Sequence, residues 1–124
     1  MAHQAEYPWK GHPRLVAMEY MNTVSPDELV ASLDRLADIM DGATMPLHTV
    51  FSFKKASSLP EKLHSLMMSS RVVGHQQCGY FVFVNADEFV KMIAKILRGE
   101  ADVSIAFAAD EDAAWEFFND MGIC

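Results

Sequence analysis

The sequence predicts a single α/β domain with a four- to five-stranded, mainly parallel or mixed sheet and about four helices. An apolar β-type run followed by a short polar residue, an acid and helical spacing occurs four times. Runs such as residues 80–84 are apolar on both faces, which is typical of strands covered by helices on both sides. The chain has 124 residues, 51% of them hydrophobic, so residues 1–124 are expected to form one domain around one core.

The first element is expected to be a hairpin. Residues 6–10 and 14–20 flank a Gly-His-Pro sequence at 11–13, which is suited to turning the chain. The hairpin would add an antiparallel strand at one edge of the sheet.

The first helix is expected to begin at Ser25. Pro26 would occupy the first helical position, where its missing N–H costs nothing, and Glu28 completes a capping-box pattern. Gly42 is expected to end the helix. Its inward stripe would consist of Leu29, Leu33, Leu36 and Met40.

The second strand-helix unit is expected to run from residue 47 onward. Residues 47–53 form the strand, and Ser58-Leu59-Pro60-Glu61 is expected to open the helix, with Pro60 in its first turn. The inward side chains would be Leu59, Leu63, Leu66 and Met67.

The last two units follow the same pattern. A strand at 79–84 leads to a helix capped by residues 85–88 and stopped by Gly99, and a strand at 103–109 leads to a closing helix. Asp110-Glu111-Asp112 places three acids at the positive end of that closing helix. Its apolar residues are Trp115 and Phe118, and those of the helix before it are Phe89, Ile93, Ile96 and Leu97.

Charge and composition restrict the partners. The chain has 17 acidic and 10 basic residues and a net charge of −7, which disfavours nucleic acid. No apolar run approaches the ~20 residues that span a bilayer, and the N-terminus lacks a signal-peptide pattern, so we expect no membrane association and a cytoplasmic location. Cys78 and Cys124 are expected to be thiols.

Sequence motifs of catalysis are missing. There is no glycine-rich nucleotide loop, nucleophile elbow or Cys-x-x-Cys, and His75 and Cys78 lack the two further ligands that a zinc site needs. We therefore expect no enzyme activity, no cofactor and no metal site. The enzyme alternative would require the distant residues His48, Ser57 and Asp87 to converge.

The best candidate site is the passage from the second strand into the second helix. Lys54 and Lys55 leave the strand, and Ser57 and Ser58 precede the helix, where N–H groups and the helix dipole favour an anion. Asn85 would emerge at the same edge of a parallel sheet and form a polar wall. The alternative is that Ser58 and Asn85 only cap helices and the lysines are solvated.

The order of these elements resembles the STAS fold of the anti-sigma-factor antagonists, also called the SpoIIAA-like fold. The resemblance covers the crossing at 53–66, the strand and capped helix at 72–89, and the closing segment 103–118, whose acidic, alanine-bearing helix start is similar to that of STAS-like proteins. The classical antagonists carry an Asp-Ser-[Ser/Thr]-Gly motif whose serine is phosphorylated by a partner kinase. Here the comparable residues are Ala56-Ser57-Ser58-Leu59, so the serine is matched while the flanking Asp and Gly are replaced.

The resemblance implies a regulatory or protein-interaction module that uses residues 54–60 and the face of the second helix, without the classical phosphorylation switch. Its partner would be a protein. The alternative is a small apolar-ligand-binding protein with a pocket lined by Met and Phe side chains. A homodimer formed through an open sheet edge is a further expectation.

Overall fold

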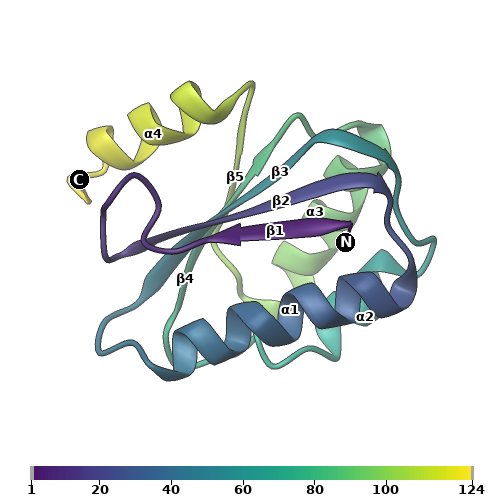
Figure 1. The fold of residues 1–124 in the computed structure, drawn as a ribbon, viewed down its shortest axis with the longest axis horizontal. Helices are drawn as coiled ribbons and strands as arrows, with labels where there is room; N and C mark the ends of the chain where they lie inside the picture. The colour runs from purple at the N-terminus through teal and green to yellow at the C-terminus, as the bar shows by residue number, and fades with distance from the viewer. Residues whose placement is uncertain (1, 124) are drawn as a thin grey trace.

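The computed structural model describes residues 2–123 and consists of one five-stranded sheet with helices on both faces (Figure 1). Along the chain the elements are β1 (His3–Glu6), β2 (Leu15–Thr23), α1 (Pro26–Asp41), β3 (Leu47–Ser58), α2 (Leu63–Met68), β4 (Cys78–Val84), α3 (Glu88–Ala101), β5 (Ile105–Ala108) and α4 (Glu111–Asp120). The predicted α/β class, mixed sheet and helix number are confirmed.

The strands lie in the sheet in the same order as in the chain. β1 pairs antiparallel with β2, and all later pairs are parallel. Crossovers between parallel strands are right-handed, so a chain that always advances in one direction places its crossover helices on one face. Accordingly, residues of α1, α2 and α3 share one core cluster, while α4 follows the last strand and lies on the other face (Figure 1).

Each face of the sheet has its own core. The larger core lies under α1–α3, where Tyr20 stacks on Phe51 and Phe53, and Phe51 meets Phe81 edge-on. The smaller core lies under α4, where Trp9 packs edge-on against Trp115 and Phe118. No helix among residues 2–123 is long and apolar enough to cross a membrane.

The hairpin prediction was correct in kind and wrong in position. β1 ends at Glu6, and residues 7–14 form the connection, which contains an isolated bridge between Trp9 and His12. Two prolines in this segment have no N–H to contribute to a strand ladder. Trp9 is buried beneath α4, so the connection serves the smaller core instead of extending the sheet.

The first helix matches its prediction. The Ser25 hydroxyl accepts a hydrogen bond from Glu28 N at 3.1 Å, Pro26 opens the helix and the four predicted inward residues are buried. The Glu28 carboxylate does not return to the cap. It accepts from Ala2 N at 3.1 Å and lies 3.2 Å from His3 Nδ1, so it joins α1 to the N-terminal strand.

The predicted start of the second helix at Ser58 was wrong. β3 continues to Ser58 because it stays paired with β2: Thr23 is the register partner of Ser58, and Val24 N donates to Ser58 O at 3.0 Å. α2 begins only at Leu63 and has no side-chain cap at Lys62. Of the predicted inward residues, Leu63 and Met67 are buried and Leu59 and Leu66 are half-buried.

The third helix is longer than predicted. It continues through Gly99 to Ala101, since one helical glycine costs only ~1 kcal/mol, and Asp102 ends it in the left-handed conformation. Its cap is Asp87, two residues after Asn85. The stripe consists of Val90, Ile93, Ala94 and Leu97, whereas Ile96 is exposed and Phe89 half-buried, contrary to prediction.

The closing helix was predicted correctly. The Asp110 carboxylate accepts from Ala113 N at 2.8 Å, and Phe118 is buried. The strand before it, β5, spans only Ile105–Ala108 and is shorter than the predicted 103–109.

Candidate functional site

The most distinctive feature of the sheet is the end of β3. β4 ends at Val84, which is the register partner of Ser52, whereas β3 continues for six more residues with β2 as its only strand partner. We call residues 53–58 the β3 extension. On the side where β4 would continue, the extension has no neighbouring strand within residues 2–123, so its backbone forms an open edge at the carboxyl end of the parallel strands.

Two irregularities in pairing shape this extension. Between the pairs Glu19–Ser52 and Met21–Lys55, β3 uses one more residue than β2, and it does so again before Ser58. A bulge places an extra residue on one strand and interrupts the alternation of side chains. As a result Lys54 and Lys55, although adjacent in sequence, line the same depression.

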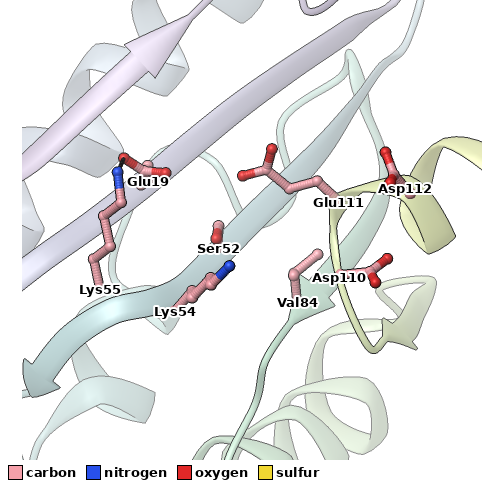
Figure 2. Close-up of a pocket in the computed structure, with 8 residues that line it drawn as sticks. All are labelled: Glu19, Ser52, Lys54, Lys55, Val84, Asp110, Glu111 and Asp112. Atoms are coloured by element: carbon pink, nitrogen blue, oxygen red, sulfur yellow. Dashed lines mark hydrogen bonds and ion pairs between the residues drawn. The ribbon is translucent and has the colours of Figure 1, made fainter.

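We call that hollow, on the α4 face of the sheet, the α4-side depression. It measures about 440 Å³ and is lined by Glu19, Ser52, Lys54, Lys55, Val84, Asp110, Glu111 and Asp112 (Figure 2). Four acidic and two basic residues line it, so its charge is negative, and the Glu111 carboxylate is the one of α4 that extends toward the lysines (Figure 2). The Lys55 amino group lies 3.4 Å from Glu19 Oε1, while Glu111 and Asp112 are exposed and have no ion pair within the described part of the chain.

Ser52 lies in the floor of the α4-side depression. Its side chain lines the hollow beside Lys54 (Figure 2), and the residue is only 4% exposed. The floor of the depression therefore carries a hydroxyl group, which can donate or accept a hydrogen bond.

A second hollow lies on the opposite face of the same extension, and we call it the α3-side groove. It measures about 210 Å³ and is lined by Phe53, Ala56, Ser57, Ser58, Leu59, Asn85, Asp87, Phe89 and Val90. Phe53 is held there by stacking on Tyr20, with ring centroids 5.6 Å apart, and by an edge contact with Phe83. The groove combines an apolar wall with a rim of hydroxyl and amide groups and the Asp87 carboxylate.

The structure divides the predicted site residues between these two hollows. Lys54 and Lys55 lie on the α4 side, and Ser57, Ser58 and Asn85 lie on the α3 side. The expected arrangement at a helix N-terminus was wrong, because α2 starts beyond them. The lysines share their hollow with four carboxylates, and this charge balance argues against an anion.

Sequence reasoning missed Ser52 and the contribution of Asp110, Glu111 and Asp112 to the site. The three acids were assigned only to the helix start, and Asp110 does perform that role. Nothing in the local sequence indicates that β5 and α4 bring them beside β3. The one available sequence signal was Ser52 itself, a polar residue within an otherwise apolar strand.

His48 lies at the other end of β3 and does not meet the remaining catalytic candidates. Nine residues of strand separate it from Ser57, or about 30 Å, so the convergence with Ser57 and Asp87 does not occur. Tyr80 N donates to His48 Nδ1 at 2.9 Å, and the Arg14 guanidinium lies 3.4 Å from His48 Nε2. Burial, and then the charges of Arg14 and His12, lower the His48 pKa to about 4.

The structure also defines the surroundings of Cys78 and His75, the two residues whose spacing was considered for a zinc site. Burial raises the Cys78 pKa to about 11, so the thiol is protonated at neutral pH. His75 Nε2 lies 2.7 Å from Asp41, and its Nδ1 accepts from Gln77 N. Within residues 2–123, no three His, Cys, Asp or Glu side chains are grouped to hold a metal ion, and Cys124 lies outside the described residues.

Comparison with known proteins supports the fold. The chain is similar to an uncharacterized protein of the DUF3478 family from Shewanella loihica PV-4, whose crystal structure has a SpoIIAA-like fold. The TM-score is 0.70 at 8% identity, over 94% of this chain and 93% of that one. The chain therefore has a SpoIIAA-like fold. No family model and no curated protein matches the sequence.

Proposed function

We propose that this chain is a non-catalytic, regulatory protein-interaction module that contacts its partner through the β3 extension. The observation that carries the proposal is the open strand edge at residues 53–58, which is accessible from a hollow on each face. Open edges are surfaces on which proteins recruit extended segments. The exposed Ser57 and Ser58 lie where the resemblance to anti-sigma-factor antagonists expects contact with a partner.

Two observations favour a protein partner over a small apolar ligand or a substrate. Phe51, Phe81 and Phe83 are fully buried against one another, so these aromatic side chains form packing core and not the wall of a ligand chamber. The His48 pKa of about 4 makes the ring a weak base, and the Cys78 pKa of about 11 keeps the thiol protonated and poorly nucleophilic at neutral pH.

The test is site-specific photocrosslinking in an extract of the source cells. A photoreactive amino acid at position 57 is compared with the same group at position 45, because Met45 is also exposed but precedes β3 at its opposite end. We expect one protein to be captured from position 57 and not from position 45. Unlabelled Met45→Arg protein should compete for this capture, and unlabelled Ser57→Arg protein should not.

Capture of the same proteins from both positions, or competition by both variants, would show that the extension is not the contact surface. Thermal unfolding of each variant checks that a failure to compete does not come from loss of folding.

A further inference from the structure

We infer that the β3 extension takes up an extended segment of the partner as an added strand, and that this segment alternates basic with apolar side chains. The inference rests on the proposed function and specifies the chemistry of its partner. It follows from three features: the open edge, the different hollows on its two faces, and the unpaired groups in the α4-side depression.

The open edge determines the form of the occupant. A strand that pairs with residues 53–58 continues the sheet in the place that β4 vacates after Val84. Successive side chains of such a strand point to opposite faces of the sheet. Every second side chain would therefore lie over the α4-side depression, and the others would lie over the α3-side groove.

The α4 side selects a basic side chain. Asp110, Glu111 and Asp112 line it, and Lys54 is the lining cation left once Lys55 is paired with Glu19. A lysine or arginine of the added strand would meet the exposed carboxylates of Glu111 and Asp112. Its N–H groups could also donate to the Ser52 hydroxyl, which lines the same hollow.

The α3 side selects an apolar side chain. Phe53, Leu59 and Phe89 are each half-buried and line the groove, so part of their apolar surface remains in contact with water. An aliphatic or aromatic side chain from the added strand would cover that surface. A charged side chain would lose hydration there without finding an opposite charge, apart from the rim near Asp87.

The edge of the sheet at β5 shows a contrasting arrangement. Ser104 O accepts from Phe81 N on β4, so the next carbonyl, Ile105 O, is directed outward. Arg98 of α3 donates to that carbonyl at 2.8 Å and occupies the edge of β5. Within residues 2–123, no side chain donates in this way to a carbonyl of the β3 extension. The edge of β5 is therefore partly occupied, whereas the edge of the β3 extension is free to pair with another strand.

The test measures binding of short fluorescent peptides to the full chain by anisotropy. The probe peptide alternates Lys and Val; the controls are a peptide of the same composition with its lysines and valines in two blocks, and a peptide that alternates Glu and Val. Two further versions of the probe carry N-methyl groups on one or the other set of alternate residues. Of the three unmethylated peptides, we expect only the alternating Lys/Val peptide to bind. Of its two methylated versions, we expect one to bind and the other to lose binding, because an added strand pairs through one edge.

Protein variants locate the site. We expect Glu111→Gln with Asp112→Asn to weaken binding about fivefold, the size expected for the loss of two exposed charge pairs. Asp34→Asn with Asp120→Asn removes the same charge from exposed positions elsewhere and should leave binding unchanged. Asp110 is left intact in all variants because it caps α4.

Equal binding of the alternating and block peptides would overturn the inference, because it would indicate attraction by net charge alone. Equal binding of both methylated versions would overturn strand addition. If photocrosslinking at position 57 succeeds while the alternating peptide fails to bind, the inference is wrong and the proposed function stands. If the peptide binds and photocrosslinking fails, the proposed function is wrong.

Discussion

Acidification should destabilise the fold through His48. The ring is 6% exposed, accepts a hydrogen bond from Tyr80 N and lies near Arg14, so its pKa in the folded protein is about 4 against an ordinary value of 6.5. Between these values the unfolded chain binds a proton that the native ring does not. The contribution of His48 to the free energy of unfolding is therefore fully present above pH 6.5 and is lost as the pH is lowered toward 4.

The size of the effect follows from the two pKa values. Lowering the pH from 7 to 5 should cost about 2 kcal/mol through this one side chain. The pKa values of Glu28 and Asp41 are also lowered, first by hydrogen bonds to the Ala2 backbone and to His75, respectively. The stability these carboxylates contribute is present above their ordinary values of 4.5 and 3.8 and is lost below them. Measurements above pH 5 therefore separate the His48 effect from theirs.

The assay is urea unfolding at pH 7, 6 and 5, followed by the fluorescence of Trp9 and Trp115 in the smaller core. We compare the wild type with His48→Gln and with the matched variant His64→Gln, which removes a histidine of α2 that contacts Glu100 at the surface. The pH dependence should shrink by about 2 kcal/mol in His48→Gln only. If the wild type and His48→Gln lose the same stability between pH 7 and 5, then His48 is not the neutral buried group described above.

Two further predictions concern stability at neutral pH. Gly79→Ala should lower the free energy of unfolding by about 3 kcal/mol, because the added Cβ would collide with His48 Nδ1 and lie 2.7 Å from Leu47 O. Gly99→Ala in α3 has open space around the added Cβ and should raise the free energy of unfolding by about 1 kcal/mol; a loss in both variants would contradict this account. Asp110→Ala should lower the free energy of unfolding by about 1 kcal/mol through the lost cap of α4, whereas Asp112→Ala should lower it clearly less. Equal losses in urea unfolding would show that the hydrogen bond from Ala113 N to Asp110 does not stabilise the helix.

The parts of the fold that could be predicted are those encoded within one turn of helix or one strand. Ser25 and Asp110 begin helices as predicted because a cap depends only on the next three residues. The end of β3 was predicted wrongly because it depends on pairing with Thr23, which is distant in the chain. Propensity favoured a helix start at Ser58, and the strand pairing overrode it.

The candidate site was predictable only in part, for a related reason. Its position at the carboxyl ends of the strands follows from the parallel topology, and Lys54 to Ser58 do lie there. The bulges that put both lysines on one face, and the passage of α4 that brings its acids beside them, are set by contacts between distant segments. Alternation along the sequence would have placed the two lysines on opposite faces.

The contact between Glu28 and the N-terminal strand has a consequence for how the edge of β2 stays covered. One carboxylate fastens the backbone of Ala2 and the ring of His3 to α1, and β1 in turn shields the outer side of β2 from His3 through Glu6. β2 is nine residues long, and its Val16, Met18 and Tyr20 are fully buried. Removal of the first few residues would break this contact and expose the edge of β2. Long apolar strands with an exposed edge pair with neighbouring molecules and aggregate.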